Sequence, residues 1–393
     1  MLRLLSLMLL SIHAFAAEPL ANIPHAYNVK ISPDGQYLAA LIDDTHQKNL
    51  TILATDTLTP IYHFAPKDSQ IGNFHWVNPQ RVVIELNERT GKIAPHMISE
   101  LYAVNYDGGQ GQMIFGERSQ NGIIISGYSA HWLSRLSADD EHILIAKTES
   151  TRLGNSTEVT KINVYTGGER TIKRSSLDDN TFVLDHQGNP RLVSGIDDDG
   201  KTKVFYSQGY GEKWHPFAIN PGNSFTPLGF SEDNQHMYAV KSEAEQAPAL
   251  YQYLVPTGAE KLLQPALKAS TYALIHDNQV YGVRIDAPPA TQQSKSKTPI
   301  ETTVAPQHIF FNPANPDSQL HQALMAKFKG APVIITSRTN DNKHLVVYVE
   351  SDTYAGDFYL VNSQSMQTRL LFSAANKQDP KRMSLIKTAL IAP

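Results

Sequence analysis

Short apolar or alternating runs, each followed by a turn rich in Gly, Asp, Asn or Pro, recur along residues 20–285. Alternation with a period of two residues is typical of a half-buried strand, and the turn residues that follow predict hairpins. The runs that predict strands are 37–42, 81–86, 100–106, 142–146, 159–165, 182–184, 203–206, 236–240, 249–254 and 279–285, and strands resume at 332–335. Long helical periodicity is missing, so the pattern predicts an all-β chain.

One sequence frame recurs four times. An apolar or β-branched residue and Ser come first, an Asp- or Asn-rich turn follows, and a strand comes after, at 31–38, 136–143, 230–237 and 336–345. Ser and Asp side chains hold a tight turn by bonding to nearby backbone amides, while Gly or Asn takes the positive φ. We expect these segments to be the inner hairpins of β-propeller blades, because a propeller repeats a four-stranded unit of roughly 40 to 50 residues.

The number of blades follows loosely from the length. The residues that follow position 16 of the 393, at roughly 40 to 50 residues per blade, give about seven or eight blades, and we expect seven. Asp-Gly hairpins occur in any all-β protein, but a two-sheet sandwich of this length would be unusual. The expected fold is therefore an all-β propeller of seven four-stranded antiparallel blades, with one short helical insertion.

That insertion lies in the one part of the chain that breaks the rhythm. Residues 287–307 are rich in Pro, Ser, Thr, Lys and Gln and have few large apolar side chains, so we expect a mobile low-complexity loop. Beyond it, Asn315-Pro316-Asp317 opens a run of apolar positions that ends at Gly330. This order of residues predicts a capped amphipathic helix.

The first residues predict export. Arg3 gives a positive start, an apolar stretch of about a dozen residues follows, and Ala14-Phe15-Ala16 resembles an A-x-A cleavage site. The stretch is short of the roughly 20 residues that span a bilayer. We expect a signal peptide over 1–16, a periplasmic or secreted protein, and no stable membrane anchor; the alternative is a buried N-terminal helix.

Composition narrows the chemistry. With 34 Lys+Arg and 38 Asp+Glu the formal charge is −4, which does not favour nucleic-acid binding. There is no Cys, so disulfides, Cys-ligated metals and a thiol nucleophile are excluded. The apolar share of 41 % is that of an ordinary globular protein.

Catalytic motifs were sought and not found. A nucleophile elbow needs Gly-x-Ser-x-Gly, because the Ser sits on a strained turn where only small flanking residues fit. The nearest approaches, around Ser129, Ser156 and Ser224, each lack the second Gly. We interpret all three as turn serines, although Ser129 has His131 nearby. Adjacency in sequence is not the geometry of a catalytic triad.

The sequence predicts neither a metal site nor a cofactor. No His-Glu-x-x-His occurs, and the scattered histidines are interpreted as surface or turn residues: His63, His75, His96, His131, His186, His215, His308 and His321. Asp197-Asp198-Asp199-Gly200 lacks the ligand positions of a calcium loop and predicts a hairpin turn. The acidic pairs 43–44, 139–140 and 178–179 are likewise interpreted as turn residues. For Trp76, Trp132 and Trp214 two roles remain open, the lining of a peptide-facing channel and packing between blades, of which the second is favoured.

Two segments carry a family resemblance. Residues 335–361, from Ile335-Thr-Ser through Tyr348-Val-Glu to Gly356-Asp357-Phe-Tyr359-Leu-Val, resemble the last propeller blade of prolyl-oligopeptidase-like serine peptidases, the S9 or acylaminoacyl-peptidase-like group. Ser32-Pro-Asp-Gly35 resembles the opening of their blades. The resemblance covers most of the chain in spacing and character, and 335–379 is its most specific part.

The resemblance implies a propeller that gates an α/β-hydrolase domain and admits short or unfolded peptides. The chain ends where that domain would begin: 373–382 resembles the connecting segment, and 383–393 is all that follows. No catalytic residue of the family is therefore carried onto this sequence. We expect the domains to be a signal peptide at 1–16, a propeller at 17–379 and a linker remnant at 380–393.

Two functions follow from the resemblance and the fold. The first is the non-catalytic N-terminal propeller of an exported S9-type peptidase, truncated or split from its hydrolase, with a peptide substrate and a hydrolase chain or domain as partners. The second is an independent periplasmic β-propeller that binds or scaffolds another molecule. A peptidase active from this chain alone ranks third, because the elbow is absent.

Overall fold

The computed structural model describes residues 25–373 except 45–46, 89–99, 117–127, 152–153, 210, 256, 268, 287–304 and 352–355. The expected signal peptide at 1–16, most of the expected loop at 287–307 and the expected linker at 380–393 lie outside these residues. Within them, no helix is both long enough and apolar enough to cross a membrane.

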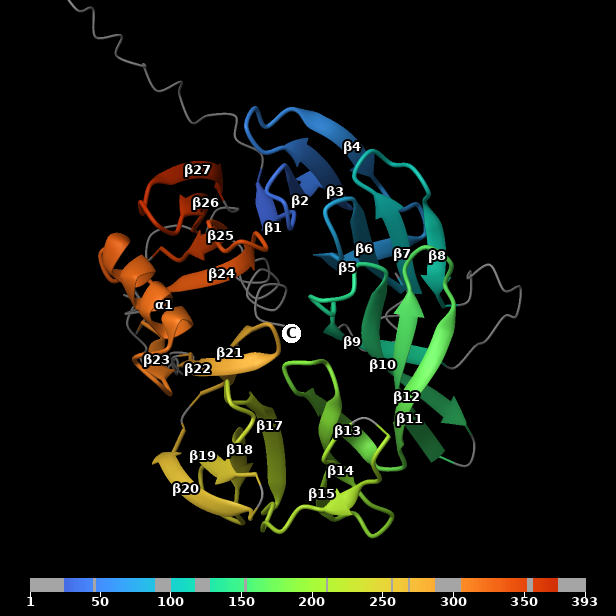
Figure 1. The fold of residues 1–393 in the computed structure, drawn as a ribbon, viewed down its shortest axis with the longest axis vertical. Coiled ribbons are helices and arrows are strands. Elements are labelled where there is room, and N and C mark those ends of the chain that lie inside the picture. The colour runs from blue at the N-terminus through green and yellow to red at the C-terminus, as the bar shows by residue number, and fades with distance from the viewer. Residues whose placement is uncertain are drawn as a thin grey trace, which may run out of the picture.

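The described chain forms seven blades arranged in a ring in chain order, of which blades 5 and 6 share one seven-stranded sheet (Figure 1). Blade 1 contains β1 (Ala26–Ile31), β2 (Tyr37–Asp44), β3 (Gln47–Ala54) and β4 (Pro60–Phe64). Blade 2 contains β5 (Ser69–Trp76), β6 (Arg81–Glu88), β7 (Glu100–Asn105) and β8 (Gln112–Phe115). Blade 3 contains β9 (Tyr128–Ser134), β10 (His142–Thr151), β11 (Gly154–Asn163) and β12 (Glu169–Ser175). Blade 4 contains β13 (Asp178–Leu184), β14 (Pro190–Ile196), β15 (Thr202–Tyr206) and β16 (His215–Pro216).

The remaining three blades include the one irregular sheet. Blade 5 contains β17 (Ser224–Phe230), β18 (His236–Ser242), β19 (Ala249–Leu254) and β20 (Ala259–Gln264). Blade 6 contains three described strands, β21 (Thr271–His276), β22 (Gln279–Ile285) and β23 (Gln307–Phe310). Blade 7 contains β24 (Val333–Arg338), β25 (His344–Val349), β26 (Asp357–Asn362) and β27 (Thr368–Ser373). Blades 5 and 6 touch through one parallel pairing, Phe230 with Gln279. The expected seven-bladed propeller is confirmed.

The helical insertion is also confirmed and follows blade 6. Helix α1 (Pro316–Lys327) begins after Asn315, whose side-chain oxygen accepts hydrogen bonds from the amides of Asp317 and Ser318. Pro316 is in the first turn of the helix, where a backbone N–H would have no acceptor within the helix, so proline is accepted there. Gly330 takes φ +85° after the helix ends. The helix therefore lies between β23 and β24 in the chain and packs against β22 and β24.

The repeated turn frame folds as expected at the inner hairpins. In the first copy, Ser32 Oγ donates to Asp34 Oδ1 over 2.6 Å and accepts from the amide of Tyr37 over 3.0 Å. The third copy repeats this geometry with Ser231 and Asp233, at 2.5 Å. Each frame thus joins the first and second strands of a blade.

The fourth copy is shifted from its expected position. Thr339 Oγ1, not Ser337, donates to Asp341 over 2.7 Å and accepts from the amide of His344 over 3.1 Å. The reason is the length of β24, which continues to Arg338 and carries Ser337 inside the strand. A threonine hydroxyl therefore has the role that serine has elsewhere.

The ring closes between blade 7 and blade 1 without exchange of a strand, because each described blade is made of consecutive strands. Figure 1 shows the two ends of the ring, blue and red, beside each other. Thr336 Oγ1 donates to the carbonyl of Val29 over 2.6 Å, and Ser337 Oγ accepts from the amide of Ile31 over 2.7 Å. One buried apolar cluster extends across this seam and includes Ile52 of blade 1 and Tyr348 of blade 7.

Candidate functional site

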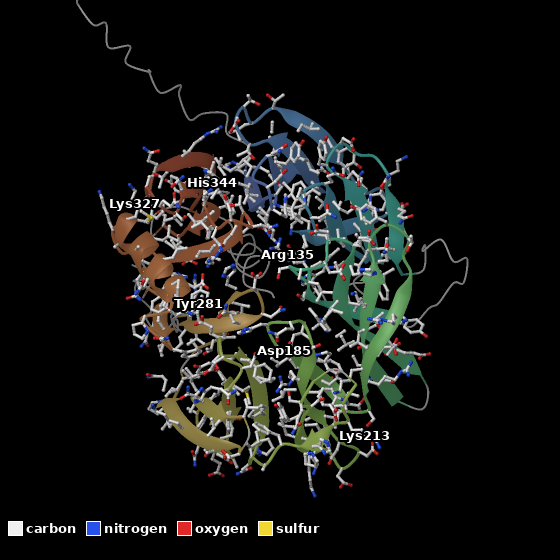
Figure 2. All side chains as sticks on the ribbon, viewed as in Figure 1. Arg135, Asp185, Lys213, Tyr281, Lys327 and His344 are labelled. Atoms are coloured by element: carbon white, nitrogen blue, oxygen red, sulfur yellow. The ribbon has the colours of Figure 1, made fainter. Side chains whose placement is uncertain are left out.

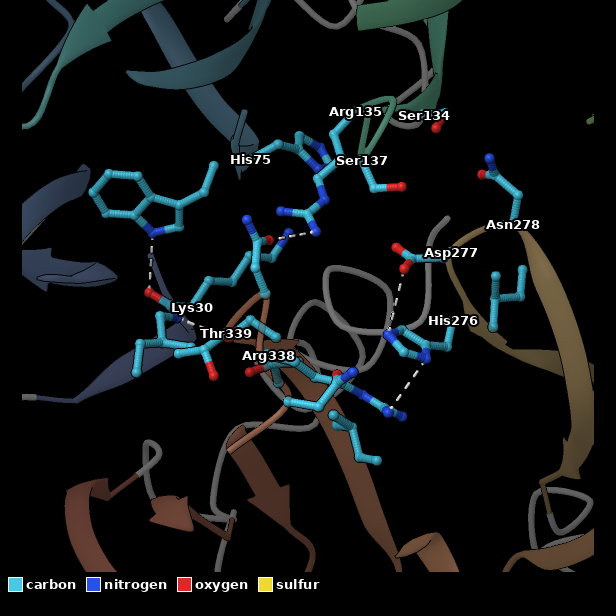
Figure 3. Close-up of a pocket in the computed structure, with 18 of the residues that line it drawn as sticks. Lys30, His75, Ser134, Arg135, Ser137, His276, Asp277, Asn278, Arg338 and Thr339 are labelled. Atoms are coloured by element: carbon cyan, nitrogen blue, oxygen red, sulfur yellow. Dashed lines mark hydrogen bonds and ion pairs between the residues drawn. The ribbon is translucent and has the colours of Figure 1, made fainter. Parts of the chain in front are cut away.

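Two adjoining cavities of about 470 and 630 Å³ lie along the axis of the ring. Taken together, they are lined by residues from the first strand of every blade. Figure 2 shows the side chains on the whole ring, and Figure 3 shows the residues that line the smaller cavity. The two cavities share Lys30, His75, Trp132, Leu133, Ile275, Asn278, Ile335 and Thr336. They therefore form one central channel, whose smaller cavity lies at the end that carries the inner hairpin turns.

Lys30 of β1 stands where the two cavities meet. Its ammonium donates to the carbonyl of Phe74 over 2.8 Å and to Asn73 Oδ1 over 3.3 Å. Both acceptors are neutral, and a lysine ammonium has three N–H groups to donate. Burial lowers the pKa of Lys30 to about 8, against the attraction of the Glu85 carboxylate.

His75 of β5 is held beside Lys30 by two neighbours. Its Nε2 lies 2.7 Å from Glu85 Oε1, and its ring stacks on Trp132 with centroids 3.7 Å apart. Burial and the charge of Lys30 lower the pKa of His75 to about 4, although Glu85 opposes the shift. His75 is therefore neutral at pH 7 and can recognise a ligand only by contact or by a neutral hydrogen bond.

An ion-pair cluster forms the blade 6 to blade 7 side of the smaller cavity. Arg338 Nη1 donates to Asp317 Oδ1, and His276 Nδ1 lies 3.0 Å from Asp317 Oδ2. Although burial raises it, the hydrogen bond from His276 and the charge of Arg338 lower the pKa of Asp317 to about 2. Asp277 is the one carboxylate among the described lining residues of this cavity, 3.8 Å from His276 Nε2.

The larger cavity combines apolar walls with a buried polar pair, Tyr281 of β22 and His321 of α1. Phe182, Leu228 and Ile334 belong to its lining. His321 Nε2 must donate to the carbonyl of Val333, 3.0 Å away, so Nδ1 accepts from the Tyr281 hydroxyl at 3.0 Å. This larger cavity is suited to apolar side chains, in contrast with the charged smaller cavity.

The three serines found from sequence lie in strands of the propeller. Ser129 and Ser156 lie within β9 and β11, so their interpretation as turn residues is wrong. The cause is that both strands begin earlier than the apolar pattern suggests, and Ser129 pairs with Thr148 in the ladder. Ser224 begins β17, and none of the three lines the channel cavities, whereas His131 does.

The interpretation of all eight histidines as surface or turn residues is wrong for three of them. His75 and His308 are largely buried and His321 is 1 % exposed. Their partners come from distant positions, which a local pattern does not show. His63 and His215 are exposed as expected, and His96 lies outside the described residues. Among the residues described, no group of three or more His, Asp or Glu side chains could hold a metal ion.

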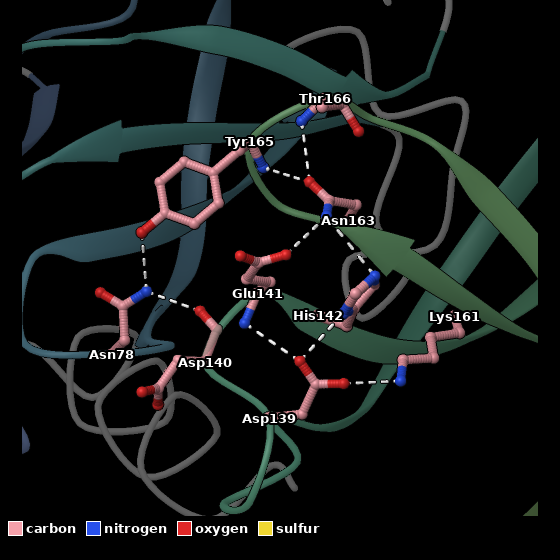
Figure 4. A network of polar contacts seen from close by, with 9 residues as sticks. All are labelled: Asn78, Asp139, Asp140, Glu141, His142, Lys161, Asn163, Tyr165 and Thr166. Atoms are coloured by element: carbon pink, nitrogen blue, oxygen red, sulfur yellow. Dashed lines mark hydrogen bonds and ion pairs between the residues drawn. The ribbon is translucent and has the colours of Figure 1, made fainter.

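The acidic turn residues fall into two groups. Asp197 Oδ1 accepts from the amides of Asp199 and Lys201, so 197–200 is the expected hairpin turn. Asp139 also lies in a turn, where Lys161 and His142 contact its carboxylate at 2.6 and 2.9 Å (Figure 4). Against the effect of burial, these contacts lower the pKa of Asp139 to about 2. The pairs 43–44 and 178–179 instead belong to β2 and β13, because those strands are longer than their apolar cores.

The tryptophans divide between the two roles left open. Trp76 and Trp132 line the smaller cavity, and Trp76 Nε1 donates to the carbonyl of Lys30 over 3.2 Å. Trp214 instead packs between blades 3 and 4, with Nε1 donating to the carbonyl of Arg174 over 2.7 Å and the Lys173 ammonium over its ring. Trp76 and Trp132 therefore line the channel, and Trp214 packs between blades.

Comparison with known proteins supports the fold alone. No family model matches the chain, and no curated protein matches it. A solved prolyl endopeptidase is 9 % identical with a TM-score of 0.51, over 91 % of this chain and 51 % of that one. The β-propeller domain of the Trilobed protease from Pyrococcus furiosus is 10 % identical with a TM-score of 0.45, over 91 % and 100 %. TolB from Acinetobacter baumannii is 11 % identical with a TM-score of 0.37, over 91 % and 67 %.

The chain spans about half the length of that prolyl endopeptidase. At such identities a shared fold does not carry a shared activity, since function resides in the site. The ring of seven blades and the match to the endopeptidase agree on one conclusion: this chain is a β-propeller.

Proposed function

We propose that this propeller is the non-catalytic, peptide-selecting part of an exported S9-type serine peptidase. The observation that carries the proposal is the central channel, to which the first strand of every blade contributes side chains. Cavities of 470 and 630 Å³ fall in the size range of ligand pockets, roughly 300 to 1,000 Å³. A short extended peptide fits such a space, and a folded domain does not.

The lining suits selection of peptides better than chemistry on them. Hydroxyl and amide groups at one end, such as Asn278 and Asn340, can bond to a peptide backbone. Apolar walls farther along, including Phe182 and Leu228, can hold side chains. To select peptides in this way, the channel needs a fixed width and polar groups that are held by hydrogen bonds. It needs no nucleophile.

The remaining parts of the proposal come from the sequence. The signal peptide at 1–16 would send the chain to the periplasm or the outside of the cell, and 380–393 would lead toward the hydrolase. The hydrolase is then either a domain of a longer polypeptide or a separate chain. Peptides that pass the channel would be its substrates.

A second function is favoured by a different observation. The seam between blades 7 and 1 is closed by hydrogen bonds of this chain alone, as with Thr336 and Val29. A ring that closes by itself can act as an independent periplasmic binding or scaffold protein. This candidate predicts a stable monomer whose partner is not a hydrolase.

Labelling with a serine-reactive fluorophosphonate separates the two. The full chain is tagged in the organism that encodes it, purified, and incubated with the probe and with an aminoacyl-peptide substrate. The proposal predicts that a hydrolase co-purifies, takes up the label and cleaves the substrate, while the chain alone takes up none. Labelling and cleavage by the pure 393-residue chain would contradict it, and a partner that carries no reactive serine would support the second function.

A further inference from the structure

Three cationic side chains meet at the smaller cavity of the channel. Lys30, Arg135 and Arg338 all belong to its lining, against the single carboxylate of Asp277 among the described lining residues. In Figure 3 the Lys30 and Arg135 side chains point into the same part of the cavity. The imbalance is local, because the whole chain carries a formal charge of −4.

Two of these cations have no carboxylate within ion-pair distance, although the Glu85 carboxylate attracts Lys30. Arg135 Nη2 donates to Asn340 Oδ1 over 3.2 Å, and Lys30 donates to Asn73 and Phe74. Neither forms an ion pair with a described residue. Lys147 and Lys241 are paired, with Glu169 at 2.6 Å and Glu260 at 2.9 Å. Arg81 and Lys173 also donate only to neutral groups, but neither lines the channel cavities.

Arg338 is the third cation, and it is partly compensated. Its Nη1 contacts Asp317 and His276, and its guanidinium also interacts with the hydroxyl of Tyr281. The His75 and His276 rings also border the cavity. His75 adds no charge at pH 7, because its pKa is about 4.

Like charges that share a cavity repel each other, and this cost falls when an anion enters between them. Carboxylates bind ammonium and guanidinium groups by charge-assisted hydrogen bonds, which are stronger than neutral ones. We infer that the smaller cavity binds a carboxylate of the peptide that occupies the channel, between Lys30 and Arg135. The inference rests on the proposed function, since it names the class of peptide selected.

The direction of the peptide follows from the rest of the lining. The carboxylate lies at the end with the inner hairpins, and apolar side chains extend toward Phe182 and Leu228 in the larger cavity. The carboxylate has two sources in a peptide, the free C-terminus and an acidic side chain. Both offer the same group to the two cations, and the experiment distinguishes them.

The test uses calorimetric titration of the full chain at low ionic strength with four acetylated pentapeptides of leucine and alanine. One has a free C-terminus, one a C-terminal amide, one a central glutamate with the amide, and one a central glutamine with the amide. A charged hydrogen bond gives roughly ten- to hundredfold in affinity. We expect at least tenfold tighter binding of a carboxylate peptide than of its matched neutral peptide. Whether the free C-terminus or the glutamate gives this gain shows which carboxylate the cavity binds.

Two substitutions with matched controls locate the site. Lys30→Met and Arg135→Gln should each lower the affinity for the preferred acid about tenfold or more and leave the amide peptide unchanged. Lys213→Met and Arg170→Gln change the net charge equally at exposed positions and should have no effect. Arg135 is partly exposed, so R135Q still decides the question if K30M fails to fold.

The outcomes separate this inference from the proposed function. Equal affinity for acid and amide peptides, or an acid preference that survives both K30M and R135Q, overturns the carboxylate site and leaves peptide selection in place. Absence of binding by all four peptides overturns both.

Discussion

Three buried histidines illustrate how much a single residue here depends on its surroundings. Burial and nearby charges lower the pKa of His75 to about 4, of His308 to about 4 and of His321 to about 3. His321 is fixed in its neutral form by one donated and one accepted hydrogen bond, to Val333 and from Tyr281. Each ring is therefore neutral in the folded protein at a pH where an unfolded chain would protonate it.

This difference makes the fold sensitive to mild acid. A folded pKa below the unfolded value near 6.5 means that the unfolded chain binds more protons, so stability is lost as pH falls through 6.5 toward 4. Each histidine contributes at most about 1.4 kcal/mol per pH unit. Urea unfolding at pH 7.5, 6.0 and 4.5 should show a falling free energy of unfolding, with a weaker slope in His321→Gln. Equal stability at all three pH values would rule this account out.

Gly229 is a second residue whose tolerance of substitution depends on its surroundings. It lies in β17 with φ +144°, and a Cβ there would be 2.3 Å from Val280 Cγ2, at the contact of blades 5 and 6. Gly229→Ala should destabilise the protein by roughly 1 to 3 kcal/mol, because neither the backbone nor the packing accepts the methyl group. Gly209→Ala, where no atom lies within 4 Å, should change stability by less than about 0.5 kcal/mol. Thermal unfolding of both variants checks this, and equal midpoints would contradict it.

At the scale of elements, the local signals in the sequence predicted the fold class and a part of the strands, and they missed others such as β1 and β5. The strands at 249–254 and 279–285 have the expected bounds, since alternation and flanking turn residues coincide there. The strand expected at 159–165 instead spans Gly154–Asn163, because a polar extension such as Ser156 pairs as well as an apolar one once its neighbour strand is present.

Local signals in the sequence could not predict the channel or the buried histidines. His75 meets Trp132, and Tyr281 meets His321, across blade boundaries or between a strand and the helix. No local period encodes these contacts, since they depend on how the blades come together. The cationic end of the channel is equally non-local, because Lys30 and Arg135 come from blades 1 and 3.

Helix α1 depends on its N-terminal cap. Asn315 accepts from two amides of the first turn, and its Nδ2 also donates to Glu232 over 3.0 Å. Asn315→Ala should cost about 1 to 2 kcal/mol, since a buried cap and a contact to blade 5 are both lost. Asn315→Ser keeps a cap acceptor and loses the donor to Glu232, so chemical denaturation should place it between wild type and N315A. A fully stable N315A would show that the cap does not hold the helix.

The whole molecule depends on the seam that closes the ring. The seam has side-chain bonds in place of a shared strand, with Thr336 and Ser337 of blade 7 bound to the backbone of Val29 and Ile31. The apolar cluster that extends from blade 7 through blade 1 into blade 2 supports these bonds. The first and last blades therefore stabilise each other, although among the described residues no strand ladder joins them.

Removal of the seam bonds should weaken the entire ring. The double variant T336V and S337A leaves the carbonyl of Val29 and the amide of Ile31 without these partners, which should cost roughly 2 to 4 kcal/mol in total. Hydrogen exchange of the Ile31 amide should rise in the variant, while amides of blade 4 change only as far as global stability falls. Unchanged exchange at Ile31 would show that the seam is held by apolar packing alone.

The central claim is that the channel is where a peptide binds, and tryptophan fluorescence tests it most directly. Trp132 lies in the channel wall and Trp214 lies between blades 3 and 4. Titration of the full chain with leucine- and alanine-containing pentapeptides should produce a saturable change in emission that the double variant Trp76→Phe and Trp132→Phe largely removes and Trp214→Phe retains. A titration without change, or a change that only Trp214→Phe removes, would contradict the claim.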